Sequence, residues 1–215
     1  MSRPDAIFFD WDGTLVDTLP GLLIAHNHVR AQFGMPLWTT EQFHHEMKFS
    51  SRELYPVIYG DSAAEAIQIL RDYMDKNIIK HLHPLRNAEV TLRRLHKAGI
   101  ATGIVSNKRQ EFLDREIAHL GWSRYLSVEA GSGFAVRDKP AGDPIRKALA
   151  AINLKPEDSL VWFVGDTATD MLAAADAACL PVLLLHGESR AEIIENHSPA
   201  YVFNDCQELL TALEL

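Results

Sequence analysis

The sequence predicts an α/β protein in which a parallel β-sheet is flanked by helices. Short, continuous apolar runs recur along the chain, and segments with helical periodicity lie between them. A continuous apolar run of about four to eight residues is typical of a strand that is buried on both faces, as in a parallel sheet. Strands that alternate with helices, joined by short polar turns, indicate βαβ units.

The elements can be assigned in chain order. The predicted strands are Ala6–Phe9, Gly99–Val105, Ser159–Val164, Leu180–Leu185 and two weaker segments, Ser127–Gly131 and Tyr201–Phe203. The predicted helices between them are Ala88–Lys97, Gln110–Leu120, Pro144–Ala151 and Thr169–Ala178. Basic residues followed by Gly99 are typical of a helix end, and Pro156-Glu157-Asp158 indicates a turn before the next strand.

The stretch from Thr18 to Leu82 breaks this alternation and contains no convincing buried strand. Apolar positions recur there at helical spacing, at Leu22, His26, Val29, Phe33 and at Ala63, Ile67, Leu70, Met74, Ile78. Glycine and proline interrupt the pattern at Gly34-Met35-Pro36 and at Gly60. We therefore expect a helical cap over residues 18–82, inserted into a core of residues 1–17 and 83–215.

Composition narrows the class of function. The 215-residue chain is 47% hydrophobic and carries a formal net charge of −8, which argues against a broad surface for nucleic acid or anionic membranes. It has two cysteines without partner spacing, no apolar signal core near its beginning, and no stretch of roughly 18 apolar residues. We expect a cytoplasmic protein with no nucleic-acid or membrane partner.

Polar residues follow the predicted strands. Reading past each strand gives Asp10 and Asp12, then Ser106 and Asn107, then Asp166 and Asp170, with Lys139 in a loop before Pro140. The carboxyl ends of parallel strands meet at one edge of a sheet, where ligands bind. Carboxylates gathered there repel one another unless a cation lies between them, and oxygen ligands favour a hard ion such as Mg²⁺.

Each acidic loop taken alone has an ordinary explanation. An Asp before Gly is usually a turn residue, and an Asp near a helix start is usually a cap. The order DxDGT, Ser-Asn, Lys and GDxxxD, each after its own strand, is poorly explained by chance.

At these residues the chain resembles the haloacid dehalogenase-like hydrolase superfamily. DWDGTLVDT, IVSNK, DKPAGDP and VGDTATDM are similar to its four motifs, in order. The helical insert is similar to a C1 cap, the arrangement of the group that includes phosphoglycolate phosphatase and β-phosphoglucomutase. The resemblance implies a Rossmann-like core, a Mg²⁺ ion and an aspartyl-phosphate intermediate.

The resemblance also implies roles for individual residues. Asp10 would be the nucleophile, and Asp12 would act as general acid and then as general base. Ser106 and Lys139 would hold the phosphoryl oxygens. Asp12 favours phosphoryl chemistry over carbon–halogen cleavage, because a halide leaving group needs no proton.

The Mg²⁺ ligands would be the Asp10 carboxylate, the Asp12 backbone carbonyl and Asp166, with Asp170 positioning metal-bound water. The backbone N–H groups of Trp11 and Asn107 would be further donors to the substrate.

Three sets of residues have competing explanations. Lys108 could touch the substrate or be a solvated lysine, and Arg52 in the cap could grip a substrate anion or lie on the surface. Paired histidines such as His81 and His83 invite a zinc hypothesis, but residues two apart on a helix point to different sides and chelate poorly.

We expect a Mg²⁺-dependent phosphatase acting on a small phosphorylated metabolite, similar to phosphoglycolate phosphatase, as a monomer or homodimer. β-Phosphoglucomutase-like phosphoryl transfer is the nearest alternative. A phospho-Asp receiver domain is a different class, but it would have adjacent acidic residues after its first strand and about 120 residues. An inactive fold used for binding is disfavoured, because every catalytic position is filled.

Overall fold

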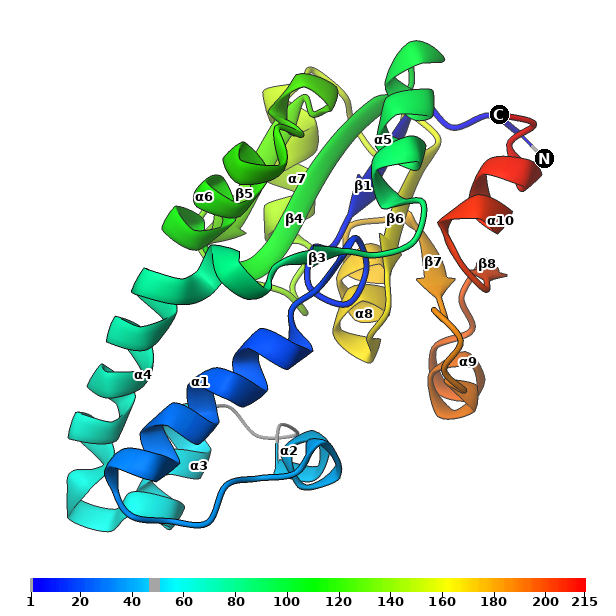
Figure 1. Cartoon of the computed structure of the whole chain (residues 1–215). Coiled ribbons are helices and arrows are strands. Elements are labelled where there is room, and N and C mark those ends of the chain that lie inside the picture. Colours follow the sequence, from blue (N-terminus) through cyan, green and yellow to red (C-terminus); the bar gives the residue numbers. More distant parts are fainter. Residues whose placement is uncertain (1, 47–50) are drawn as a thin grey trace. The chain divides into compact units, whose positions relative to one another are not determined.

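The computed structural model describes residues 2–46 and 51–215 and divides the chain into two compact units (Figure 1). The α/β unit comprises the residues up to Asp17 and His83–Leu215. The helical unit comprises Thr18–Leu82. Each unit is described by itself.

The α/β unit is built on a six-stranded sheet. In spatial order its strands are β5 (Val128–Ser132), β4 (Ala101–Arg109), β1 (Ala6–Phe9), β6 (Val161–Gly165), β7 (Leu180–Leu184) and β8 (Tyr201–Phe203). Every pairing in this sheet is parallel, which confirms the predicted fold class. A short antiparallel ribbon of β2 (Val16–Asp17) and β3 (His83–Pro84) lies outside the sheet.

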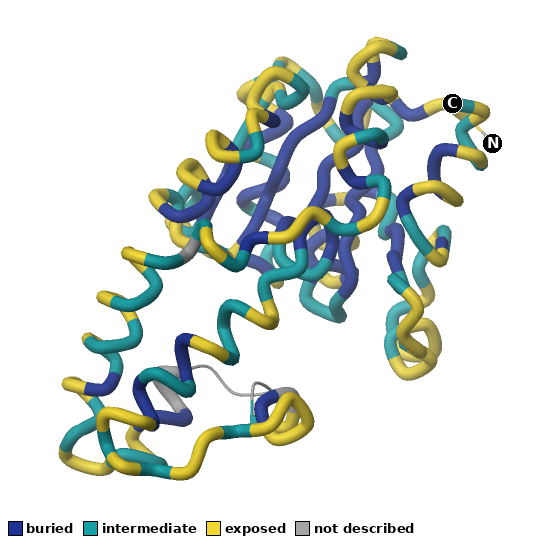
Figure 2. The backbone as a smooth tube through the Cα atoms, in the orientation of Figure 1, coloured by how far each residue is buried: buried dark blue, intermediate teal, exposed yellow. Residues whose placement is uncertain are grey.

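Helices lie between the strands of this sheet, and one further helix follows the last strand, β8. They are α5 (Ala88–Lys97), α6 (Gln110–Leu120), α7 (Asp143–Ala151), α8 (Ala168–Asp176), α9 (Ala191–His197) and α10 (Cys206–Ala212), with a 3₁₀ turn at η3 (Ser123–Tyr125). Figure 2 shows the strands of the α/β unit as mostly buried, while the helices alternate buried and exposed positions. This is the burial expected when helices cover both faces of a parallel sheet.

The burial of the central strand β1 on both faces explains why its sequence is a continuous apolar run. Ala6 and Phe8 pack in one cluster with Ile145 and Leu149 of α7 and Ala173 of α8. Successive side chains of a strand point to opposite faces, so Ile7 and Phe9 point to the other side of the sheet, where they too are fully buried. Both faces of β1 are therefore core.

The structure differs from the prediction at the end of β4. The apolar pattern ends at Val105, but the strand continues to Arg109, which pairs with Ser132 after a register shift. Ser106, Asn107 and Lys108 thus lie in the irregular last part of a strand instead of a loop. Polar side chains at a strand end carry no apolar period, so the sequence pattern does not reveal this extension.

The helical unit contains α1 (Leu19–Gln32), α2 (Thr40–Glu46), α3 (Ser51–Tyr59), η1 (Gly60–Ser62), α4 (Ala63–Asn77) and η2 (Ile78–His81). Its small core gathers Val29, Leu54, Tyr55 and Ala66 from three of these helices. His26 is also buried there, with Nδ1 at 3.1 Å from the Tyr55 hydroxyl. The histidine on the apolar side of α1 is therefore a packed residue within this unit.

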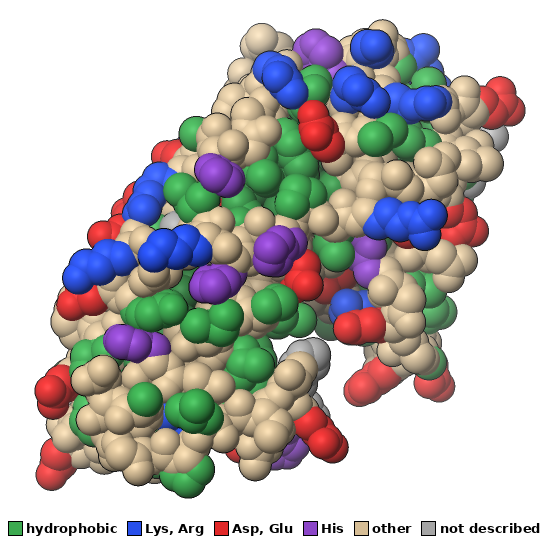
Figure 3. Space-filling model, in the orientation of Figure 1, with side chains coloured by type: hydrophobic (Ala, Val, Ile, Leu, Met, Phe, Trp, Pro, Cys, Tyr) green, Lys and Arg blue, Asp and Glu red, His purple; other side chains and the backbone are tan. Residues whose placement is uncertain are grey.

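The surface carries charges of both signs. Figure 3 shows acidic and basic side chains interspersed with neutral ones on the face drawn. Among the described residues, no helix combines the length and the apolar composition that crossing a membrane requires.

Candidate active site

The chain turns sharply where β1 ends, and this turn positions two carboxylates. Asp10 follows Phe9 directly, and its backbone N–H donates to the Val164 carbonyl of β6 at 2.8 Å. Gly13 has φ of +80°, and a Cβ there would lie 2.7 Å from Asp166 Oδ2. Only glycine accepts this conformation easily and lets the turn approach the neighbouring strand end so closely.

Lys139 lies at the centre of the site and is almost completely buried. Its Nζ is 2.7 Å from Asp10 Oδ1 and 2.7 Å from Asp170 Oδ1. Burial acts to lower the pKa of Lys139, but Asp10 and Asp170 raise it above its ordinary value. Lys139 is thus a fixed positive charge between two carboxylates.

Asn107, at the end of β4, holds the backbone of Lys139 in place. Its Nδ2 donates to the Lys139 carbonyl at 2.8 Å, and its Oδ1 accepts from the Lys139 N–H at 3.0 Å. The side chain of Asn107 therefore serves the loop that carries Lys139. The expected donation from the Asn107 backbone to a substrate remains a prediction.

Asp170 occupies the first turn of α8. Its Oδ2 accepts from the backbone N–H of Thr167 at 3.0 Å and from the Thr167 hydroxyl at 2.6 Å, which completes a capping box. Its other oxygen contacts Lys139. A Cβ on Gly165 would lie 2.3 Å from the Asp170 Cβ. Position 165 must therefore be glycine for the end of β6 to lie this close to the start of α8.

Asp166, at the end of β6, has two further partners. The Thr14 hydroxyl donates to Asp166 Oδ1 at 2.9 Å. Arg190 Nη2 lies 3.1 Å from Asp166 Oδ2, and Arg190 Nη1 donates to the Asp166 carbonyl. These contacts fix the carboxylate of Asp166 from both sides.

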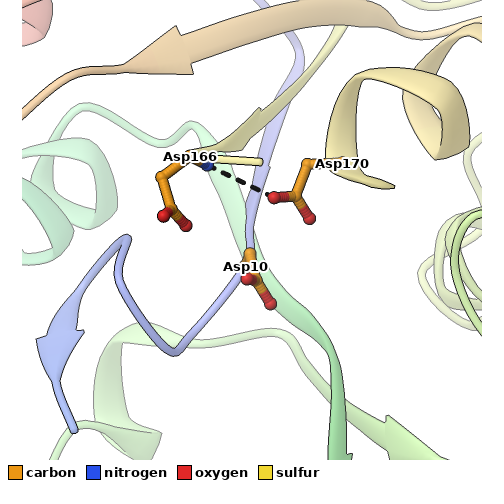
Figure 4. A group of neighbouring side chains, drawn as sticks. All are labelled: Asp10, Asp166 and Asp170. Atoms are coloured by element: carbon orange, nitrogen blue, oxygen red, sulfur yellow. Dashed lines mark hydrogen bonds between the residues drawn. The ribbon is translucent and has the colours of Figure 1, made fainter. Parts of the chain in front are cut away.

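Asp10, Asp166 and Asp170 face a common space, as Figure 4 shows. One carboxylate oxygen from each lies within 4.8 Å of the others. Burial raises the pKa of Asp10 to about 7, with Lys139 opposing the shift and Asp170 adding to it. Burial also raises the pKa of Asp166 to about 6, with Asp170 adding to that shift and Arg190 opposing it.

These raised pKa values describe carboxylates that are crowded with negative charge. A cation among them favours their charged forms. The donors are all oxygens, which suits a hard ion such as Mg²⁺. The three carboxylates could therefore hold a metal ion.

The side chain of Asp12 faces a different partner. Its Oδ1 is 2.7 Å from Lys108 Nζ, and Asp12 is not one of the three clustered carboxylates. Ser106 is buried, and its Oγ accepts from the Lys108 N–H at 3.2 Å. The side chain of Lys108 is mostly buried against Asp12 at the pocket and is not a solvated lysine, while its contact with a substrate remains a prediction.

A pocket of about 340 Å³ in the α/β unit gathers most of the predicted residues. It is lined by Asp10, Asp12, Ser106, Asn107, Lys108, Lys139, Thr167, Thr169 and Asp170. The Trp11 side chain is fully buried and is not among the lining groups. The side chain of Arg52 lies outside the part of the chain that the structure describes.

Several residues that touch this site were not predicted from the sequence. Thr14 could have been found, because it belongs to the DGT segment. Thr167 and Thr169 also lie inside a recognised segment, between Asp166 and Asp170. No pattern indicates Arg190, which follows Asp166 by 24 residues and reaches back to it. Glu116 is fully buried beside Lys108, and its spacing from Phe112 and Leu113, which puts it on the apolar side of α6, is the signal that could have found it.

Several known proteins are similar to this chain in sequence. Residues 7–183 match the family model described as haloacid dehalogenase-like hydrolase. The chain is 29% identical to a phosphoglycolate phosphatase of Salmonella typhi, over 97% of this chain and 92% of that protein. It is 30% identical to a phosphoglycolate phosphatase of Xanthomonas campestris, over 87% of this chain and 86% of that protein.

A similar structure has also been solved. It is a haloacid dehalogenase-like family hydrolase from Streptococcus pneumoniae, with a TM-score of 0.83 and 25% identity. The similarity covers 96% of this chain and 97% of that one.

Proposed function

Because the chain belongs to the haloacid dehalogenase-like hydrolase family, it is a hydrolase, and we propose that it is a Mg²⁺-dependent phosphatase of small phosphomonoesters. One observation carries this proposal. Asp10, Asp166 and Asp170 meet around buried Lys139 at the carboxyl edge of the sheet, beside a pocket that also contains Asp12. A buried nucleophile, a cation and a second carboxylate are the groups that phosphoryl transfer needs.

In the first half of the proposed reaction, a carboxylate oxygen of Asp10 attacks phosphorus in line with the ester bond. The new Asp10–phosphorus bond forms as the bond to the leaving oxygen breaks. Asp12 donates a proton to that oxygen. Lys139 and Ser106 hold the phosphoryl oxygens, and the charge of Lys139 is already in place because it is buried against Asp10.

In the second half, Asp12 accepts a proton from the attacking water, and the aspartyl phosphate is hydrolysed. Asp10, Asp166 and the Asp12 carbonyl would hold Mg²⁺, and Asp170 would orient its water. When bound, the ion offsets the negative charge of the phosphoryl group and of the carboxylates.

Phosphoglycolate is the first candidate substrate. This choice is supported by relatives described as phosphoglycolate phosphatases that match nearly the whole chain. A small phosphorylated metabolite is in keeping with a pocket of about 340 Å³.

The test is steady-state phosphate release from a panel of esters that includes 2-phosphoglycolate and sugar phosphates, with Mg²⁺ or with EDTA. We expect release only with Mg²⁺, and none from Asp10→Asn. Asp158→Asn changes an exposed residue in the turn before β6 that does not line the pocket, so it serves as the matched control and should retain activity. A requirement for a sugar bisphosphate, with no net phosphate release, would favour a mutase. No release from any ester by folded protein would contradict the proposal.

A further inference from the structure

Glu116 is an unusual residue for the inner side of a helix. It lies in α6, and its side chain is fully buried. Glutamate is almost never fully buried unless it is paired. A position that merely packs a helix on a sheet takes an apolar residue, so the partners of Glu116 deserve an explanation.

Both partners of Glu116 lead to the active site. Glu116 Oε2 accepts from Trp11 Nε1 at 2.6 Å and lies 2.8 Å from Lys108 Nζ. Trp11 stands between Asp10 and Asp12 in the sequence. Lys108 Nζ in turn is 2.7 Å from Asp12 Oδ1. A continuous set of contacts therefore runs from Trp11 through Glu116 and Lys108 to Asp12.

The indole of Trp11 is itself held in place. It packs edge-on against Trp122, with ring centroids 5.6 Å apart, and both side chains are buried. Its N–H direction is therefore fixed, and so is the oxygen of Glu116 that receives it. Glu116 Oε1 is buried and has no hydrogen-bond partner among the described residues, which is unfavourable for the fold. The fold retains a carboxylate where an apolar residue would avoid this cost.

The geometry points to Glu116 as a positioning residue for proton transfer by Asp12. By holding Lys108 Nζ and Trp11 Nε1 on one carboxylate oxygen, Glu116 keeps Lys108 against Asp12 Oδ1. That contact restricts rotation of the Asp12 carboxyl group. This inference rests on the phosphatase function proposed above.

The contact matters at one moment of the reaction. When Asp12 gives its proton to the leaving oxygen, the Asp12 carboxyl becomes a carboxylate beside the ammonium group of Lys108. Lys108 stabilises this new charge only if it stays in place, and Glu116 keeps it there. An alkoxide leaving group needs the proton, whereas 4-nitrophenolate is stable enough to leave without it.

The test is therefore a comparison of two leaving groups in Glu116→Gln, which keeps the size of the side chain and removes its charge. We expect kcat/KM for 2-phosphoglycolate, or for the best alkyl ester of the panel, to fall roughly 10- to 100-fold. For 4-nitrophenyl phosphate we expect a decrease of less than about 3-fold. The ratio kcat/KM is used because it reports the steps up to transfer onto Asp10.

Glu111→Gln is the matched control. It makes the same change on the same helix, at an exposed position paired with Arg109, and should leave both substrates unaffected. Trp11→Phe, which removes the indole donor together with part of the buried ring but keeps an aromatic side chain against Trp122, is the second variant and keeps the test valid if Glu116→Gln does not fold. It should show the same selective loss, and the double variant should lose less than the two single losses combined.

The outcomes separate the inference from the proposed function. Equal losses on both esters, or no loss on either, in a folded variant of active enzyme would overturn the role of Glu116 alone. Absence of phosphate release by the wild-type protein would instead overturn the proposed function, and the inference with it.

Discussion

Asn107 binds the backbone of Lys139 with both ends of its amide, so that a residue on β4 fixes the loop whose lysine contacts Asp10. These two hydrogen bonds connect segments that are 32 residues apart in the chain. The position of the Lys139 ammonium group therefore depends on a neutral side chain.

Asn107→Ala should lower kcat roughly 10- to 100-fold, because Lys139 loses the contacts that hold its backbone. The measurement is steady-state phosphate release with Mg²⁺. Asn204→Ala removes an exposed asparagine that bonds Glu208 and is the control. Full activity of Asn107→Ala would show that the loop keeps Lys139 in place without these two hydrogen bonds.

Gly13→Ala should abolish most activity, roughly 100-fold or more, because its Cβ would meet Asp166 Oδ2 at 2.7 Å and displace it. Gly99→Ala is a matched control, since Gly99 also has positive φ but open space around it. Both variants should lose about 1–2 kcal/mol of stability from backbone strain, and Gly13→Ala should lose more because Asp166 is displaced from its partners. Only Gly13→Ala should lose activity. Phosphate release measures the activity of both variants, and urea unfolding measures their stability.

Mg²⁺ should stabilise the protein against unfolding. At a concentration 100 times the Kd, binding to the folded state alone adds about 2.7 kcal/mol. Thermal unfolding in EDTA and in Mg²⁺ measures the shift in Tm. Asp166→Asn should lose most of this shift, while Asp158→Asn should retain it. An unchanged shift in Asp166→Asn would mean that Mg²⁺ binds elsewhere.

His26 should make stability depend on pH. Burial, together with a smaller contribution from nearby Arg30, lowers the pKa of His26 from 6.5 to about 4. Between these values the unfolded chain binds a proton that the folded chain does not, so stability falls as the pH falls. The free energy of unfolding should fall by about 3 kcal/mol from this histidine alone as the pH falls from 6.5 to 4.

The measurement is the free energy of unfolding from urea curves at several pH values, for wild type and for His26→Gln. The difference between the two should narrow as the pH falls through this range. His28→Gln, the same substitution on the same helix, is the matched control. A constant difference between wild type and His26→Gln would contradict the predicted effect of pH.

Much of the α/β fold follows from apolar runs. The strand Ala6–Phe9 is buried on both faces, so all of its residues are apolar. A short continuous apolar run of this kind is typical of a strand in a parallel sheet. The polar residues that follow these runs meet at one edge because parallel strands all end there. That is why Asp10, Asp166 and Lys139 could be expected to lie together before their distances were known.

The remaining parts of the site have no such pattern. Arg190 contacts Asp166 because the loop after β7 returns to the end of β6. The local sequence does not predict the course of that loop. Glu116 occupies a buried face of its helix, where a charged residue type is ordinarily expected to be exposed. Its burial depends on Lys108 and Trp11, which only the folded chain brings to it.

The order of the strands also determines when the site can form during synthesis. β1 pairs with β4 on one side and with β6 on the other, and Asp5 bonds Leu160, 155 residues later. The Asp10 turn emerges from the ribosome early, but Asp166 must emerge before the three carboxylates can meet. A nascent chain that ends before β6 holds Asp10 without Asp166 or Asp170, so the carboxylate cluster proposed to bind Mg²⁺ can be complete only after more than three quarters of the chain has been translated.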